Sequence, residues 1–241
     1  MRWHLRRPAA ALILIISLFT SVPAIAGSLE DADKALIQGD YKTAYRLFKP
    51  LAEQGNSNAQ YNLGVMYLKG KGVPQDYGEA MKWYRKAADQ GKANGQHGLC
   101  FMYYSGDGVP QDYAEAVKWC RKAAESGFAQ SEYFMGMVFE EGKGVRQDYV
   151  ESGKWYRLAA EQGEVMAQFK LGVAYGNGQG VPQNYVLAHM WFNLAASRLE
   201  HSSEMRETAI GNRNKIASKM TPAQIAEAQK LAKEWKPKKE R

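Results

Sequence analysis

The chain has 241 residues, of which 45% are hydrophobic and 24% charged, an ordinary composition that excludes a disordered or collagen-like protein. Its formal charge of +7 comes from the two ends, because residues 1–26 carry three arginines and no acid, and residues 230–241 carry six basic residues against two acidic ones. The stretch 27–229 is formally neutral and lacks the basic stripe with which nucleic-acid-binding proteins displace counterions. We therefore expect no nucleic-acid partner.

The first 26 residues have the layout of a secretory signal peptide. A basic start is followed by an apolar run from Ala9 to Phe19 and then by an A-x-A cleavage site that ends at Ala26. The run is shorter than the roughly 20 residues that span a bilayer, so an uncleaved anchor is the minority interpretation. We expect an exported mature chain that begins near Gly27 and has no membrane insertion after cleavage. A periplasmic location is preferred, and secretion is the alternative.

A unit of 36 residues recurs through the rest of the chain. The segment GVPQDY stands at 72–77 and 108–113, and it returns as GVRQDY at 144–149 and as GVPQNY at 180–185. The same spacing relates Trp83, Trp119, Trp155 and Trp191, and also Gly55, Gly91, Gly127 and Gly163. A fixed period of this length is the signature of a stacked repeat array.

Each unit is predicted to form two helices joined by the GVPQDY segment. In the first unit, the apolar residues Ala59, Leu63, Met66 and Tyr67 share one face of a helix. Glycines at 70 and 72 then break that helix and permit a tight turn. The second helix ends before Gly91 and has its own apolar face, made of Ala80, Trp83, Tyr84, Ala87 and Ala88.

The acidic residues of the connecting segment are explained by helix capping. Asp76, Asp112 and Asp148 each stand three residues before a glutamate, the spacing of a capping box in which both side chains bond to backbone amides. A row of catalytic or metal-binding carboxylates is the less favoured alternative, because such sites bring different residues to one pocket. The common zinc and hydrolase signatures are missing from the sequence, so we expect no catalytic, cofactor-binding or metal site.

The two ends of the array are predicted to be helical caps. Residues 27–54 fit capping helices that form a partial repeat, 55–198 hold four two-helix repeats, 199–235 form C-terminal capping helices, and 236–241 are a basic tail. Thr221, Pro222 and Gln224 predict the N-cap, the first turn and the capping box of the last helix. Stacked arrays need such terminal caps for solubility.

Three motifs recur in these units: A-x-x-x-L-G in the first helix, G-x-G-V-x-x-D-x-x-x-A-x-x-W-(Y/F) in the turn and second helix, and A-A-x-x-G at the end. Over about residues 39–198 they resemble the SLR family, the Sel-one-like repeats related to tetratricopeptide repeats. The resemblance implies an all-α protein, an α/α superhelical solenoid used for protein–protein contact and often found in bacterial envelopes. It implies no common set of catalytic residues.

Two cysteines depart from the repeat pattern in the same unit. Cys100 stands where other units have glycine, and Cys120 stands where they have tyrosine or phenylalanine. Cysteine is larger than the glycine it replaces and smaller than the aromatic residue it replaces. These opposite changes in size indicate that the two positions contact each other. Exported chains meet an oxidising environment, and no other cysteine is present. We predict a disulfide between Cys100 and Cys120, with two buried free thiols as the alternative.

Variable positions on the first helix of each unit are the expected partner-binding residues. The stripe at 58, 62, 65 and 69, with its equivalents in later units, lies away from the core stripe and changes from copy to copy. The resemblance implies that this helix lines the concave side. We predict a partner-binding surface formed by Phe101, Phe134, Met137, Val65 and Val173. The alternative is that neighbouring repeats bury these side chains.

We therefore expect a non-enzymatic periplasmic protein–protein interaction module that scaffolds or regulates an envelope protein through its concave surface. The first alternative is a secreted or surface-exposed factor that binds host or extracellular proteins. The last is an enzyme acting on cell-wall or β-lactam substrates, as the resemblance to cysteine-rich family members suggests. This chain has a single cysteine pair rather than many, which disfavours that last interpretation.

Overall fold

The computed structural model describes residues 28–200 and 203–238, so the predicted signal peptide and the last residues of the basic tail lie outside the described residues. The described part contains twelve α-helices and no strand. The helices are α1 (Leu29–Ile37), α2 (Tyr41–Glu53), α3 (Ser57–Lys69), α4 (Tyr77–Asp89), α5 (Ala93–Ser105), α6 (Tyr113–Glu125), α7 (Ala129–Glu141), α8 (Tyr149–Gln162), α9 (Val165–Asn177), α10 (Tyr185–Arg198), α11 (Glu204–Ala217) and α12 (Pro222–Glu234).

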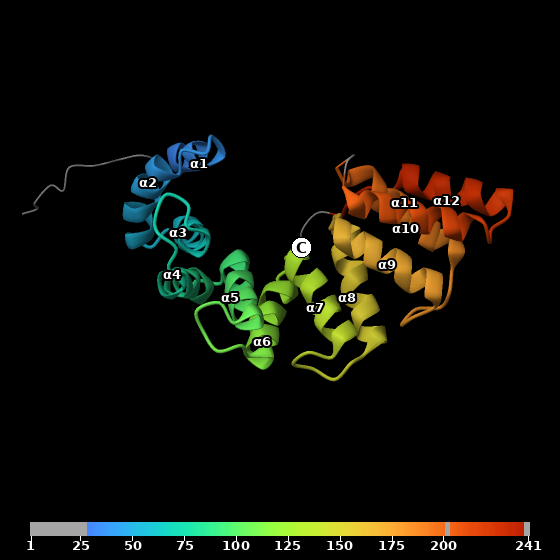
Figure 1. Cartoon of the computed structure of the whole chain (residues 1–241), viewed down its shortest axis with the longest axis horizontal. Coiled ribbons are helices and arrows are strands. Elements are labelled where there is room, and N and C mark those ends of the chain that lie inside the picture. Colours follow the sequence, from blue (N-terminus) through green and yellow to red (C-terminus); the bar gives the residue numbers. More distant parts are fainter. Residues whose placement is uncertain (1–27, 201–202, 239–241) are drawn as a thin grey trace, which may run out of the picture.

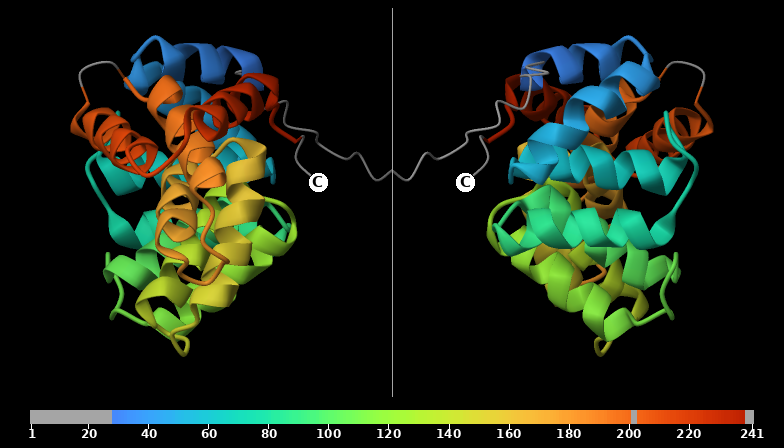
Figure 2. Two further views of the ribbon diagram at one scale, coloured as in Figure 1. Left: turned by 90° about the vertical axis from the view of Figure 1, so that its right-hand side faces the viewer. Right: turned by 90° about the vertical axis from the view of Figure 1, so that its left-hand side faces the viewer.

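The helices follow one another along a curved array (Figure 1). Each helix from α1 to α10 packs against the next one in the sequence, and both α11 and α12 pack against α10. Seen from its two ends, the array has α1 and α12 on one side and the units around α6 and α7 on the opposite side, so it bends into an arch (Figure 2). The predicted all-α solenoid is confirmed.

The predicted apolar faces form the interior of the array. In the first full unit, the side chains of Leu63, Met66, Trp83 and Tyr84 are at most 5% exposed, whereas Tyr67 is only partly buried. Full burial of a large apolar side chain stabilises a fold by about 1.5–3 kcal/mol. Helical spacing of the apolar residues therefore identified the core correctly.

The second glycine of each turn forms the joint between two units. Gly144 has a φ of +73°, a conformation that favours glycine. A Cβ atom there would lie 2.4 Å from the carbonyl oxygen of Tyr113, the first residue of α6 in the preceding unit. The glycine and the tyrosine of the recurring segment are thus the two sides of one contact, which explains why they recur together.

The capping prediction is half right. The Asp76 carboxylate accepts a hydrogen bond from the backbone N–H of Glu79 at 3.0 Å and so caps α4. The predicted reciprocal bond is wrong, because the Glu79 carboxylate accepts instead from Lys82 Nζ at 2.7 Å and from Trp83 Nε1 at 3.0 Å. The box predicted for α12 is complete, with Thr221 and Gln224 each accepting from the other's backbone N–H.

The two cysteine positions contact each other as expected. In the first full unit, a Cβ atom on Gly64 would lie 2.5 Å from the ring of Tyr84, so the glycine is needed to admit the aromatic ring. At the equivalent positions of the next unit, Cys100 and Cys120 are joined by a disulfide, with their Cα atoms 5.2 Å apart. The bond links α5 to α6 in the middle of the array.

Candidate functional site

Four of the five predicted binding positions occupy one column of the repeat. Val65, Phe101, Met137 and Val173 lie at equivalent places on α3, α5, α7 and α9, and we call the surface around them the variable face. Phe101 is 44% exposed, and the other three are partly buried. Two hollows of about 230 and 260 Å³ open on this face, one near each end of the column.

The first hollow lies between α3 and α5 and has a volume of about 230 Å³. It is lined by Tyr61, Val65, Leu68, Lys69, Tyr84, Asn94, His97, Gly98 and Phe101. We call it the α3–α5 hollow. Gly98, where the other units have Asn62, Phe134 and Lys170, lines it against the ring of Tyr84. Two of the predicted binding residues, Val65 and Phe101, form part of its apolar wall.

The polar side chains in the α3–α5 hollow either have no partner among the described residues or carry no charge. Asn94 makes no hydrogen bond within the part of the chain that the structure describes, and its buried Oδ1 has no partner there. Lys69 is exposed and forms no ion pair with any described residue. Burial lowers the pKa of His97 to about 4, so this ring is neutral at pH 7, and its Nδ1 lies 2.9 Å from Ser131 Oγ.

Phe134 does not belong to the exposed surface. It is 7% exposed, and its ring centre lies 4.8 Å from that of Tyr104. The physical reason lies in the preceding unit, where the Tyr84 ring fills the space beside Gly98. In the next unit, Cys120 stands at the position of Tyr84, so no aromatic ring fills the equivalent space. Phe134, at the position equivalent to Gly98, packs into the core there. Burial by neighbouring repeats, the alternative considered for this residue, is what the structure shows.

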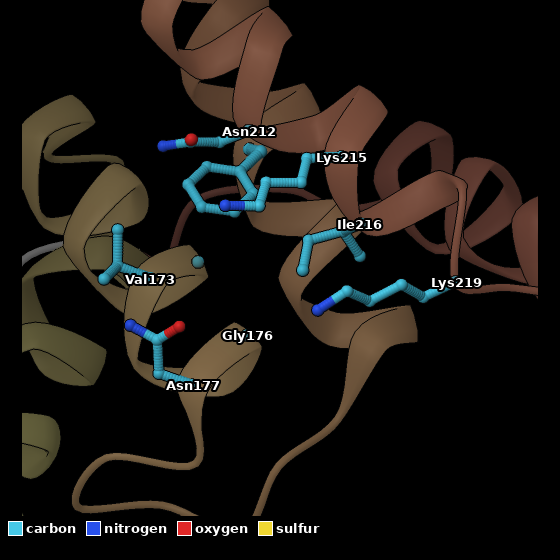
Figure 3. Close-up of a pocket in the computed structure, with 9 residues that line it drawn as sticks. Val173, Gly176, Asn177, Asn212, Lys215, Ile216 and Lys219 are labelled. Carbon is cyan, nitrogen blue, oxygen red and sulfur yellow. The ribbon is translucent and has the colours of Figure 1, made fainter.

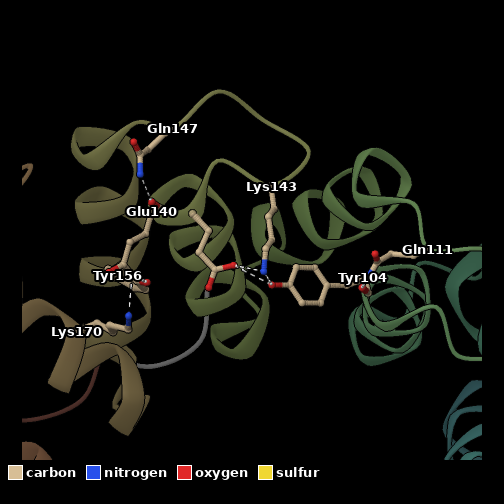
Figure 4. A network of polar contacts seen from close by, with 8 residues as sticks. Tyr104, Gln111, Glu140, Lys143, Gln147, Tyr156 and Lys170 are labelled. Carbon is tan, nitrogen blue, oxygen red and sulfur yellow. Dashed lines mark hydrogen bonds and ion pairs between the residues drawn. The ribbon is translucent and has the colours of Figure 1, made fainter.

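The centre of the variable face carries charges that the protein neutralises itself (Figure 4). Lys143 Nζ lies 2.8 Å from Glu141, whose carboxylate also accepts a hydrogen bond from the Tyr104 hydroxyl at 3.0 Å. Hydrogen bonding from Lys143 lowers the pKa of the Glu141 carboxyl. Lys170 pairs with Glu140 at 2.9 Å. The partly buried Met137 packs against the core clusters on both sides of it, so the column is continuous between the two hollows.

The second hollow lies between α9 and α11 and has a volume of about 260 Å³ (Figure 3). It is lined by Gly172, Val173, Gly176, Asn177, Phe192, Asn212, Lys215, Ile216 and Lys219. We call it the α9–α11 hollow. It opens at Gly176, where the other units have Leu68, Tyr104 and Glu140. A predicted binding residue, Val173, forms part of its wall.

A further hollow of about 440 Å³ lies away from this column, between α8 and the turn before α10. Val150, which is 53% exposed, is among the residues that line it.

Within residues 28–200 and 203–238, no three His, Cys, Asp or Glu side chains are grouped to hold a metal ion. In the same residues, no helix has both the length and the apolar character needed to cross a bilayer.

The sequence located only part of this surface. Lys215, Lys219 and Asn212 were missed because they follow the last repeat, where no equivalent positions exist for comparison. Gly176 carried a signal that could have been read, since a glycine in a column of large residues marks a place where side-chain volume is missing. Gly98 also lines the other hollow, but there the Tyr84 ring fills the space beside the glycine.

Stacked helix pairs with hollows on one face define a helical repeat protein of the solenoid class. The Sel1 repeat family matches residues 31–56, 57–92, 93–128, 129–164 and 165–198, and the chain belongs to this family. The resemblance inferred from the motifs is confirmed. The first matched repeat falls on α1 and α2, a segment that the sequence suggested was a partial repeat. Sel1 repeat proteins are generally protein–protein interaction modules.

Several solved structures share this fold. The chain is 29% identical to a Sel1 repeat protein from Oxalobacter formigenes, with a TM-score of 0.65 over 81% of this chain and 87% of that one. It is 31% identical to a protective antigen of uropathogenic Escherichia coli strains with an SLR fold, with a TM-score of 0.55. That match covers 86% of this chain but 52% of the antigen, so the chain spans about half of that relative.

A Sel1 repeat protein from Klebsiella pneumoniae subsp. pneumoniae is 20% identical, with a TM-score of 0.51 over 78% of this chain and 90% of that one, and shows the fold alone. No curated protein matches the chain.

Proposed function

We propose that this chain is a non-enzymatic protein-binding module that holds or regulates an envelope protein by binding a segment of it on the variable face. The observation that carries the proposal is the α3–α5 hollow, where the exposed ring of Phe101 stands beside the unpartnered amide of Asn94. Aromatic residues at the centre of a polar surface are typical binding hot spots. The family resemblance implies that this face is the concave side of the solenoid, which supports the proposal.

The size and chemistry of the α3–α5 hollow fit a peptide side chain. Its volume of about 230 Å³ is below the roughly 300–1,000 Å³ of small-molecule pockets, and it suits one anchoring side chain. A buried polar atom without a partner costs about 1–3 kcal/mol. The Asn94 amide is therefore poised to regain hydrogen bonds with the backbone of a bound peptide, which offers both a donor and an acceptor.

We place this activity outside the cytoplasm, in the periplasm. The layout of residues 1–26 supports export, and the Cys100–Cys120 disulfide fits an oxidising compartment, where such bonds persist. Cell fractionation tests the location. Recovery of the protein with periplasmic markers is the expected result, and recovery only in the cytosol contradicts it.

A secreted or surface-exposed factor is the second candidate. The Escherichia coli relative is described as a protective antigen, which favours a location outside the cell for a protein of this kind. The same face would bind a host or extracellular protein. Recovery of the protein in the culture medium or on intact cells, rather than in the periplasmic fraction, would favour this candidate.

The binding face is tested with random dodecapeptides displayed on phage and selected on the purified full chain. We expect the selected peptides to bind the Phe101→Ser variant at least tenfold more weakly, as for a hot-spot residue. The variant should lose less than about 1 kcal/mol of unfolding free energy, because Phe101 is 44% exposed.

Val150→Ser is the matched control, since it removes an exposed apolar side chain from the hollow outside the variable face. It should leave peptide affinity unchanged. The proposal is wrong if no peptide is enriched, if the peptides bind Phe101→Ser as well as the parent, or if Val150→Ser alone abolishes binding.

A further inference from the structure

The α9–α11 hollow holds two positive charges that no described residue neutralises. The amino groups of Lys215 in α11 and of Lys219 just after it form no ion pair or hydrogen bond within residues 28–200 and 203–238. The Lys219 amino group lies 5.4 Å from the centre of the Tyr185 ring. Both side chains reach from the α11 side of the hollow toward Val173 and Asn177 on α9 (Figure 3).

No acidic side chain is among the nine residues that line this hollow. The centre of the variable face is different, because Glu140 and Glu141 there pair with lysines of the protein itself. Two like charges in a concave site with apolar walls add their fields and attract a negative group. The hollow thus has a positive charge that no described side chain neutralises.

Helix stabilisation does not account for this arrangement. A basic residue in the last turn of a helix is favourable near the negative end of the helix dipole, and Lys215 lies in the last turn of α11. Lys219 lies beyond that helix, and it still lines the same hollow. Gly176 leaves this part of α9 without a large side chain, and Ile216 of α11 packs directly against it, because a Cβ atom there would lie 3.2 Å from Ile216 Cδ1.

The remaining lining residues favour a peptide over a simple anion. Val173, Phe192 and Ile216 supply an apolar wall, which an inorganic anion would not use. Asn177 and Asn212 have amides without a hydrogen-bond partner in the described residues, and such amides pair well with a peptide backbone. The combination fits a carboxylate that stands beside an aliphatic side chain on a peptide chain.

The other end of the variable face repeats this chemistry in a weaker form. Lys69 is the charged residue at the rim of the α3–α5 hollow, whose lining also includes no acid. A segment that contacts both hollows therefore meets lysines beside apolar walls at each end. Complementary charge of this kind mainly sets partner choice and the rate of association.

We propose that the α9–α11 hollow is a carboxylate-binding subsite, in which Lys215 and Lys219 select acidic segments of the partner protein. This inference rests on the proposed function and adds the chemistry of the partner. The residues that bind the carboxylate are the two lysines, and Gly176 provides the space. The occupant is an acidic peptide segment that has an aliphatic residue next to its carboxylate.

The test uses the random dodecapeptides displayed on phage and selected on the full chain. We expect the selected peptides to be enriched in aspartate or glutamate beside aliphatic residues. The Lys215→Glu/Lys219→Glu variant should bind them about tenfold more weakly, because two attractive charge contacts become repulsive. The control is Lys230→Glu/Lys233→Glu, which makes the same change of charge on exposed positions of α12 and should alter affinity by less than about twofold.

Two further measurements locate the contact. A zero-length carbodiimide, which joins a carboxyl group to a nearby amine with loss of water, should link an acidic peptide to Lys215 or Lys219. The Gly176→Leu variant keeps both charges but fills the hollow, and it should weaken binding as well.

The outcomes separate the inference from the proposed function. Peptides that need Phe101 but bind the double lysine variant normally would overturn the carboxylate subsite and leave the proposed function standing. Displacement of the peptides by low-millimolar inorganic phosphate would show a simple anion site and overturn the acidic-peptide assignment. Peptides that need the lysines but not Phe101 would support the subsite and contradict the role that the proposed function gives to Phe101.

Discussion

At the scale of single residues, three differences between neighbouring units belong together. Cys100 replaces a glycine, Cys120 replaces an aromatic residue, and Phe134 stands where the preceding unit has Gly98. In the preceding unit, the Tyr84 ring fills the space between Gly64 of its own unit and Gly98 of the next. In the unit with the cysteines, a disulfide holds the helix pair together, and a phenylalanine from the next unit supplies the missing ring.

This interpretation predicts opposite effects of one substitution in two backgrounds. Phe134→Gly should destabilise the parent protein by about 3–5 kcal/mol, as for other buried phenylalanines. In a Cys100→Gly/Cys120→Tyr background, the new tyrosine needs the space that Phe134 fills, so Phe134→Gly should raise stability. Urea unfolding in reducing buffer measures both, and the reductant removes the disulfide contribution of about 3 kcal/mol from the comparison. Equal destabilisation in the two backgrounds would contradict the interpretation.

The sequence predicted the cysteine contact but not the role of Phe134. Cys100 and Cys120 lie in one unit, so comparing copies of that unit revealed them as a pair. Phe134 compensates for a residue in the preceding unit, and a comparison within single units cannot show such a relation. Helical spacing alone put Phe134 on the variable stripe and so predicted a surface residue. Packing between units decides its burial, and spacing does not show that packing.

At the scale of helices and turns, the recurring segment is explained by the close approach of neighbouring units. Gly144 lies against the backbone of Tyr113. Gly91 has a similar positive φ of +79°, but a Cβ atom added to it would meet no other atom within 4 Å. Both glycines satisfy a backbone requirement, and only Gly144 also satisfies a packing requirement. In the repeat pattern alone, the two positions look equivalent.

The two alanine substitutions should therefore differ in cost. Gly91→Ala places an alanine at positive φ, which costs about 1–2 kcal/mol. Gly144→Ala adds a collision with the Tyr113 backbone and should cost about 1–3 kcal/mol more, as for other overpacked sites. Urea unfolding gives the two free energies, and hydrogen exchange should show the loss for Gly144→Ala in α6 to α8. Equal costs for the two variants would show that the joint contributes no packing energy.

Helix starts show how far spacing determines contacts. The position of Asp76 before α4 was sufficient to predict its cap, because the acceptor needs only the nearby backbone amide. The predicted donor to Glu79 was the Asp76 backbone N–H, but this N–H donates to the Tyr67 carbonyl at 3.0 Å, and the Glu79 carboxylate accepts from Lys82 and Trp83 instead. A hydrogen bond between two charged groups is stronger than one to a neutral amide, and spacing does not rank them.

At the scale of the whole molecule, the array is held by contacts between neighbouring helices, and its ends require separate cover. Both α11 and α12 pack on α10, and the rings of Trp191 and Trp235 meet with their centres 6.2 Å apart. The apolar spacing of the last helix predicted that it forms, but the way α11 docks creates the α9–α11 hollow. Docking geometry depends on the shapes of both surfaces, which the repeat pattern does not contain.

A nearest-neighbour array predicts that damage to one end stays near that end. Trp235→Ala removes the ring that contacts Trp191 and the cation of Arg198, and it should cost on the order of 2 kcal/mol because the ring is partly exposed. Hydrogen exchange protection should fall in α9 to α12 and stay unchanged in α3 and α4, since each unit is coupled mainly to the next. Ile37→Ser, at an 86% exposed position near the other end, is the control and should change neither region. A uniform loss of protection along all the described helices would show that the chain unfolds as one cooperative unit. The helices around the two hollows would then unfold with the same free energy.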